Sequence, residues 1–291
     1  MASLVRRLFL EKLLGTSLSA TASTIIDLEV LRRSLEIRGF LGACQLPIVI
    51  VGPVKVGCEC LREEVFIPLT PLDPLITELL LQGAETVDEN IIKITSTRQF
   101  CKILIRTEEH RGKYLATCLR ENLRRNNVSY NRGTKLFIIE IYEDFDVRTI
   151  LKNCTTQRGT VAGYTVSERY VVRTEIGKEF DVLNYIDVLR PVLEEIVRSI
   201  PYCLTPSIGL VSHVELLSMT STAKHLIVEM LVDSLWSYPH LQVLSPTLSE
   251  MWSIISKKGT FEPRCCAELL GLTSALTLLA LSSIWTSCYE L

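Results

Sequence analysis

The stretch Gly42–Pro53, with the sequence GACQLPIVIVGP, decides the fold of this chain of 291 residues. Its apolar run Pro47–Val51 predicts a β-strand, and Glu64–Ile67 predicts a second strand after a glycine-containing turn. The chain then reaches Asp73-Pro74, a pair that is typical of a helix start. We therefore expect two strands followed by a helix over Leu75–Gln82.

The residues after about position 100 predict a small β-α-β unit. Strands are expected at Lys102–Arg106 and Lys135–Glu143, on either side of a helix at Lys113–Arg125. Another strand, Ser167–Glu175, is expected to close the unit. The asparagine-rich connection Asn126–Gly133 is typical of turns, so we expect a surface loop there.

Helical patterns dominate both ends of the chain. An amphipathic helix is predicted at Ser3–Gly15. Apolar residues recur at helical spacing over Val182–Ile200, where Pro191 is expected to kink or restart the helix because proline lacks a backbone donor. Lys224–Val232 predicts a buried strand, and Cys265–Trp285 predicts an apolar C-terminal helix.

The composition excludes several classes of protein. Hydrophobic residues make up 47% of the chain, which is ample for a sizeable core and argues against disorder as the main state. The 31 basic and 33 acidic residues give a formal net charge of −2, so no bulk positive field favours nucleic acid. We therefore expect no nucleic-acid partner.

The ten cysteines lack the spacing of a closed zinc site, which needs two C-x-x-C pairs or Cys/His pairs. They lie at positions 44, 58, 60, 101, 118, 154, 203, 265, 266 and 288. Cysteine behaves as a small apolar side chain, so we expect buried free thiols and no bound metal. Reduced thiols, and an N-terminal helix interrupted by charges, predict a cytoplasmic protein.

One segment, Leu269–Cys288, carries no charge over a length of about 20 residues, which is enough to cross a bilayer. Seven serine and threonine residues dilute its apolar character, and no Lys or Arg follows it to anchor an interface. We expect a buried core helix, so that membrane association is not expected, and a tail anchor stays open as the alternative.

The Gly42–Pro53 stretch resembles the substrate-binding segment of hydroxymethylglutaryl-CoA reductases. That segment follows the pattern I-G-x-x-x-x-P-x-G-x-A-G-P and leads to a strand ending P-L-A-T-T-E-G, whose Glu is a catalytic acid. The Gly52-Pro53 pair and the Ile67-Pro68-Leu69 strand are retained here, and Asp73 stands in place of the Glu. Arg6–Gly15 also resembles the lead-in of the short, membrane-free class of these enzymes.

The resemblance implies a set of site residues. Asp73 would be the catalytic residue, and Gly52 and Pro53 would bind substrate. Arg98, in a Thr-Arg pair similar to the family's T-R motif, would bind the substrate carboxylate. Gly177 is the one glycine where the family places its small-residue turn beside the dinucleotide. NADPH is the implied cofactor and a CoA thioester the implied substrate.

The departures from the family are as informative as the matches. Where the family has its catalytic Lys, the chain has Val211-Ser212-His213-Val214, and the motifs that carry the catalytic Asp and His are not found. Asp73 is one methylene shorter than Glu, and a displacement of about 1 Å can cost about a hundredfold in rate. The resemblance therefore implies a degenerate member of the family.

The resemblance also implies the domain organisation. We expect an α+β fold in which a large substrate-type domain holds a small inserted ferredoxin-like α+β domain. Residues 1–94, with the substrate-type segment 40–84, would form the first part of the large domain. Residues 95–172 would form the inserted cofactor-type domain, and residues 173–291 the second part of the large domain, with the apolar C-terminal helix.

Three functional hypotheses follow from the sequence. The first is a scaffold or partner subunit with lost or severely reduced catalysis, pairing as a homodimer or with an active reductase of the isoprenoid (mevalonate) pathway. The second is a residual NADPH-dependent oxidoreductase or CoA-thioester binder that uses Asp73 and Arg98, with Lys55 or Lys178 as the cation. The third is a tail-anchored, membrane-associated protein.

Overall fold

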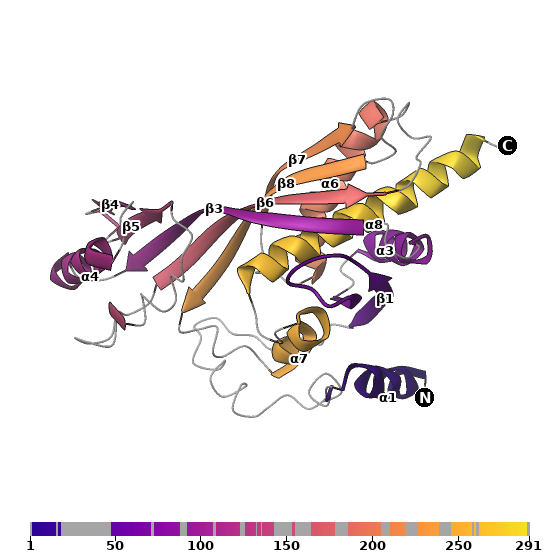
Figure 1. The fold of residues 1–291 in the computed structure, drawn as a ribbon, viewed down its shortest axis with the longest axis horizontal. Helices are drawn as coiled ribbons and strands as arrows, with labels where there is room; N and C mark the ends of the chain where they lie inside the picture. The colour runs from indigo at the N-terminus through magenta and orange to yellow at the C-terminus, as the bar shows by residue number, and fades with distance from the viewer. Residues whose placement is uncertain are drawn as a thin grey trace.

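The computed structural model has a mixed α+β fold with antiparallel sheets (Figure 1). It describes residues 2–15, 17–18, 48–70, 73–87, 92–106, 109–122, 126–131, 133–134, 136–142, 153–154, 164–177, 186–204, 210–218, 226–238, 246–257, 259 and 262–289. The helices are α1 (Ala2–Leu14), α3 (Pro74–Glu85), α4 (Glu109–Asn122), α6 (Ile186–Leu204), α7 (Pro246–Ile255) and α8 (Pro263–Tyr289). The strands are β1 (Val49–Lys55), β2 (Glu64–Leu69), β3 (Ile92–Arg106), β4 (Asn126–Asn131), β5 (Leu136–Ile141), β6 (Tyr164–Ile176), β7 (Leu210–Ser218) and β8 (Leu226–Tyr238).

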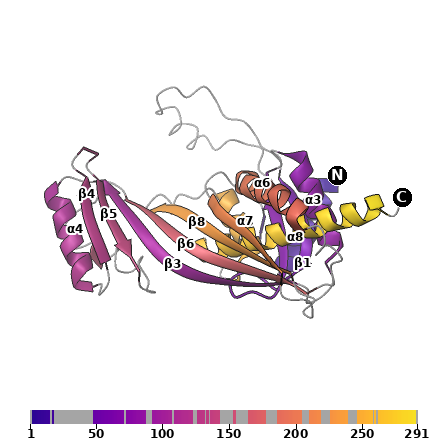
Figure 2. The ribbon, with the colours of Figure 1, turned by 90° about the horizontal axis from the view of Figure 1, so that it is seen from above.

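The described strands form two sheets. A six-stranded sheet has the order β4-β5-β3-β6-β8-β7, and every neighbouring pair in it is antiparallel. The long strands β3, β6 and β8 are neighbours in its middle, and they run from the side of α4 and β5 toward β1 (Figure 2). β1 and β2 form a separate antiparallel pair.

Two hydrophobic cores lie at opposite ends of the six-stranded sheet. α8 runs alongside one end of the sheet and contacts β3, β6 and β8, with α3 and α6 beside it (Figures 1 and 2). Its residues from 265 to 280 are all buried, since they pack between the sheet and the flanking helices. At the other end, α4 covers β4 and β5, and a second core forms around Ile103, Leu119 and Ile139.

The expectation of a buried apolar C-terminal helix is confirmed. The segment Pro263–Ile284 is long and apolar enough to cross a membrane, but 94% of an apolar stretch of 18 residues within it is buried inside the protein. Its serine and threonine hydroxyls are satisfied within the helix, as when Thr277 donates to the Thr273 carbonyl at 2.9 Å. A helix covered in this way is a core element, and the dilution by Ser and Thr was the signal for it.

The structure differs from the sequence-based expectation at two places. The connection expected as a loop contains the edge strand β4, where Val128 and Tyr130 alternate with polar residues and pack on the second core. An edge strand tolerates Asn because one side of its ladder faces solvent. α6 continues through Pro191, so the helix does not restart there, because one missing donor near its start is outweighed by burial of Leu193 and Val197.

The expectation of free thiols was wrong for four of the cysteines. Among the described residues, Cys60 pairs with Cys265 and Cys118 pairs with Cys154, while Cys58, Cys101 and Cys266 are thiols outside any disulfide. Cys60 and Cys265 are 205 residues apart in the chain and 5.2 Å apart between Cα atoms. Their proximity depends on the fold, which is why the spacing of cysteines in the sequence did not indicate it.

Candidate functional site

The Gly52-Pro53 pair lies within β1, at an irregularity of its pairing with β2. The register shifts between Val51 and Val54, and the peptide bond between Gly52 and Pro53 is cis. Gly52 has a φ of 130°, and a Cβ atom there would lie 2.6 Å from the Val65 carbonyl oxygen. Only glycine fits this position, and both residues of the pair are exposed.

Asp73 is the N-cap of α3. Its Oδ1 accepts a hydrogen bond from the Leu75 backbone N–H at 2.9 Å, and Pro74 occupies the first turn. This arrangement satisfies a backbone donor at the start of the helix and explains why the Asp-Pro pair begins a helix here. The Asp73 side chain is exposed and helps to set where α3 begins.

Arg98 lies on β3 in a buried cluster of charged and polar side chains. Its Nη1 is 3.3 Å from Glu168 Oε1, and the two side chains are 12% and 9% exposed. The Tyr170 hydroxyl donates to the other Glu168 oxygen at 2.5 Å. Arg169, the residue between Glu168 and Tyr170 on β6, forms a two-pronged ion pair with Asp233 at 2.6 and 2.9 Å. Glu168 therefore keeps Arg98, the predicted substrate-binding residue, in a mostly buried ion pair.

Burial in this cluster raises the pKa of its two uncharged titratable side chains, Tyr170 and Cys101. Desolvation, followed by the charge of Glu168, raises the pKa of Tyr170 well above its ordinary value. The same two causes raise the pKa of the Cys101 thiol. Both groups therefore stay protonated at neutral pH, and Tyr170 acts as a hydrogen-bond donor to the carboxylate.

Replacing Tyr170 by Phe is expected to lower the free energy of unfolding by about 1.5–3 kcal/mol at pH 7, because a charge-assisted hydrogen bond to Glu168 is lost. The raised pKa of Tyr170 gives the difference a pH dependence. The unfolded tyrosine ionises near pH 10, so the advantage of the tyrosine chain is full below pH 10 and shrinks above it. Urea denaturation at pH 7 and pH 10.5 measures this, and a difference that grows with pH would contradict it.

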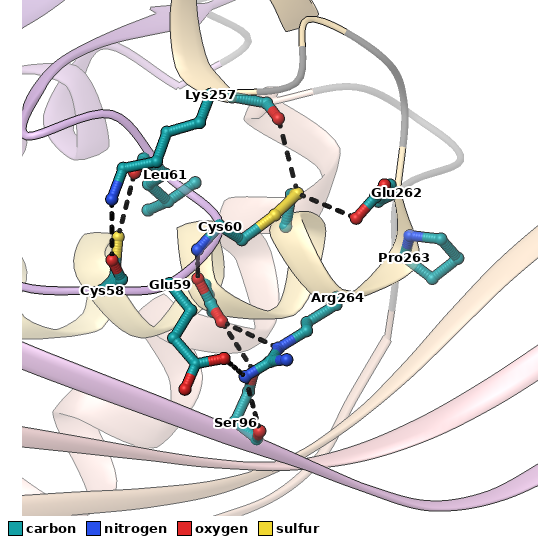
Figure 3. The surroundings of a disulfide bond; sticks show 12 residues. Cys58, Glu59, Cys60, Leu61, Ser96, Lys257, Glu262, Pro263 and Arg264 are labelled. Carbon is teal, nitrogen blue, oxygen red and sulfur yellow. Dashed lines mark hydrogen bonds and ion pairs between the residues drawn. A yellow bond between two sulfur atoms is a disulfide. The ribbon is translucent and has the colours of Figure 1, made fainter. Parts of the chain in front are cut away.

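A second buried polar network links α8 to the β1–β2 connection (Figure 3). Glu268 is 0% exposed and accepts hydrogen bonds from the Cys60 backbone N–H at 3.0 Å and from the Ser96 hydroxyl at 2.8 Å. Arg264 donates to the same carboxylate at 3.2 Å and also reaches Glu59. The network joins three segments that are far apart in the chain.

The predicted site residues fall on two parts of the structure. Gly52, Pro53 and Asp73 belong to the β1–β2–α3 unit, whereas Arg98 lies on the six-stranded sheet. Gly177 is exposed and directly follows β6. The backbone of Gly57 joins the two parts, because it donates to the Ile92 carbonyl at 3.0 Å and accepts from Ile94 at 2.8 Å.

Several residues of interest were not found from the sequence. Glu168 and Tyr170 sit on the inward face of β6, where apolar residues alternate with outward polar ones. A charge on the buried face of an alternating strand is a usable signal for a buried ion pair. His213 lies on β7, but its side chain is outside the described residues, as is Lys178.

The chain shares sequence with one known enzyme over a limited segment. No protein-family model matches the chain. The 3-hydroxy-3-methylglutaryl-coenzyme A reductase of Aeropyrum pernix is 38% identical to it over 87 residues. This match includes 30% of this chain and 20% of that enzyme, so it spans about a fifth of the relative's length.

The fold of this chain is similar to solved structures of one enzyme. The 3-hydroxy-3-methylglutaryl-coenzyme A reductase of Streptococcus pneumoniae aligns over 96% of both chains with a TM-score of 0.51 and 11% identity. The class II enzyme of the same organism bound to NADPH in open conformations covers 96% of both chains with a TM-score of 0.46 and 11% identity. The chain is thus similar to one 3-hydroxy-3-methylglutaryl-CoA reductase in sequence over this segment, and to another in its mixed α+β fold.

Proposed function

We propose that this reductase-like protein has lost catalysis, or retains very little, and serves as a scaffold or partner subunit. The role of Asp73 carries the proposal. A catalytic acid must present an O–H to the substrate, whereas the Asp73 carboxylate accepts a backbone N–H at the start of α3. A side chain used for helix capping supports a structural role at the position of the family's acid.

The ion pair of Arg98 supports the same proposal. An arginine that binds a substrate carboxylate must be able to offer its guanidinium to that ligand. Here the Arg98 guanidinium already forms a mostly buried ion pair with Glu168. Breaking such a pair costs free energy, because it leaves a buried charge without a partner. Substrate binding through Arg98 would require displacement of Glu168.

The domain organisation and the cofactor remain part of the proposal. We assign residues 1–94 and 173–291 to a substrate-type domain and residues 95–172 to an inserted ferredoxin-like domain, with Gly177 near any bound dinucleotide. The second core around Ile103, Leu119 and Ile139 supports a separately packed inserted unit. NADPH is the cofactor to test, because the Streptococcus pneumoniae enzyme binds it.

A partner role requires a surface that a second subunit can cover. α1 exposes Leu8, Phe9 and Leu13 by 51%, 61% and 49%, and these positions fall on one side of a helix. Large apolar side chains that are exposed together favour burial in an interface. We assign this face of α1 to contact with a second copy of the chain or with an active reductase.

Light scattering after size-exclusion chromatography tests the partner role. The chain alone, or mixed with an active reductase, is expected to elute as a complex, and Phe9→Glu is expected to shift it toward the monomer mass. Val188→Glu on α6 is a control because Val188 is 51% exposed but lies on another helix. A monomeric chain that binds no reductase would contradict the partner role.

An NADPH titration followed by fluorescence, with and without 3-hydroxy-3-methylglutaryl-CoA, tests the cofactor separately. We expect weak or no saturation, because the small-residue turn of the family is reduced here to Gly177. Saturable binding that is strengthened by the CoA thioester would contradict this expectation and favour the oxidoreductase hypothesis.

A further inference from the structure

Two buried cysteines and a carboxylate converge at the first turn of α8 (Figure 3). Cys60 comes from the β1–β2 connection, whereas Glu262 and Cys265 come from the start of α8. The two Sγ atoms and a carboxylate oxygen of Glu262 all lie within 4.8 Å of one another. We call Cys60, Glu262 and Cys265 the thiol–carboxylate cluster.

We propose that the thiol–carboxylate cluster binds a zinc-like divalent cation when its disulfide is reduced. A dithiol reductant gives two electrons and two protons to the Cys60–Cys265 bond, which becomes two thiols, and the reductant becomes a disulfide. The cation then binds both sulfurs as thiolates and releases the two thiol protons to solvent. The oxidised and metal-bound forms exclude one another.

The residue types suit zinc better than calcium or magnesium. Thiolates are soft ligands that favour Zn²⁺, and a carboxylate oxygen is a normal third ligand. Three protein ligands leave the fourth tetrahedral position for water. Glu262 is half-buried while Cys60 and Cys265 are 5% and 0% exposed, so the open position would face solvent on the side of Glu262.

The size of the cluster also fits. Zn–S bonds of about 2.3 Å in tetrahedral geometry place the two sulfurs about 3.8 Å apart. The carboxylate of Glu262 is 4.0 Å from Cys265 Sγ. The Cα atoms of Cys60 and Cys265 are 5.2 Å apart, so rotation of the two side chains can direct both sulfurs at one ion.

The surroundings hold the ligands whether or not the sulfurs are bonded. The Cys60 backbone N–H donates to Glu268 at 3.0 Å, and its carbonyl accepts from the Lys257 N–H at 3.1 Å. The Ser256 hydroxyl lies 3.6 Å from Cys265 Sγ. Support of this kind around the ligands orients them and raises metal affinity. Reduction therefore leaves a preorganised pair of thiols rather than a loose loop.

The proposed metal would keep the β1–β2 connection fixed to α8 under reducing conditions. Disulfide and metal would thus be two alternative links between the same two segments. The sequence did not indicate this site, because its ligands come from positions 60, 262 and 265 rather than from a local C-x-x-C pattern.

Cobalt binding to the reduced full-length protein tests the proposal. The protein is reduced with dithiothreitol, desalted without oxygen and titrated with Co²⁺, whose thiolate charge-transfer absorption reports sulfur ligands. Reduced protein is expected to bind one ion per chain more than Cys265→Ser does, and Zn²⁺ should displace it. Oxidised protein is expected to lack this ion. Equal binding by the reduced parent and Cys265→Ser would overturn the proposal.

A second pair of variants keeps the test valid if Cys265→Ser folds poorly. Glu262→Gln retains both thiols and is expected to weaken metal binding by at least about 10–100-fold, because even the loss of a group that only supports a ligand costs that much. Glu59→Gln is the matched control, because its carboxylate lies beside Cys60 in the chain but bonds to Arg264. Equal affinities of these two variants would also overturn the proposal.

Discussion

Replacing Glu268 by Ala is expected to lower the free energy of unfolding by about 3–5 kcal/mol, because removal of one partner leaves buried donors without an acceptor. The carboxylate is fully buried and accepts from the Cys60 backbone, the Ser96 hydroxyl and the Arg264 guanidinium. The same change would loosen the β1–β2 connection from α8. Urea denaturation followed by circular dichroism measures the loss.

The chain offers a matched control for this prediction. Glu194 and Arg198 form an ion pair with the same spacing of four residues as Arg264 and Glu268, but on the exposed side of α6. Glu194→Ala is expected to cost only about 0.3–0.5 kcal/mol, since solvent screens an exposed pair. Similar losses in Glu268→Ala and Glu194→Ala would show that the buried network contributes no more than a surface pair.

Replacing Gly83 by Ala is expected to destabilise the protein by about 3 kcal/mol, at the upper end for overpacking. A Cβ atom at Gly83 would meet the Leu276 carbonyl oxygen and lie 2.7 Å from its carbonyl carbon. These are backbone atoms of α8 and cannot rotate away, so α3 would have to move off α8. Thermal unfolding measures the effect.

Gly57→Ala is the control for the Gly83 variant. The nearest atom to a Cβ at Gly57 is the Lys93 Cγ at 3.6 Å, which is ordinary contact with a flexible side chain. We expect a change within about 0.5 kcal/mol. If Gly83→Ala were as stable as Gly57→Ala, the close approach of α3 and α8 would be wrong.

Local patterns predicted those parts of the fold that depend on neighbouring residues. The apolar run at Pro47–Val51 predicted β1, and the Asp-Pro pair predicted the start of α3. The uncharged C-terminal segment predicted α8. β4 was missed because its asparagines resemble a turn, although it pairs with the next strand, β5, in a local antiparallel hairpin.

The polar clusters could not be predicted in the same way. Glu168 meets Arg98 across 70 residues, and Glu268 meets Cys60 across 208 residues. The sequence shows that a charge sits on a buried face, but the partner is decided by the pairing of β3 with β6 and the packing of α8. The roles predicted for Asp73, Arg98, Gly52, Pro53 and Gly177 stay predictions.

The rate of NADPH oxidation in the presence of 3-hydroxy-3-methylglutaryl-CoA tests the central claim most directly. The Aeropyrum pernix reductase, assayed beside this chain, provides the reference rate. We predict a rate at least about a hundredfold below that reference, since Asp73, the predicted catalytic residue, is shorter than the family's Glu and serves as a helix cap. A substrate-dependent rate comparable to the reference, and lost in Asp73→Ala, would contradict the claim that catalysis is lost or severely reduced.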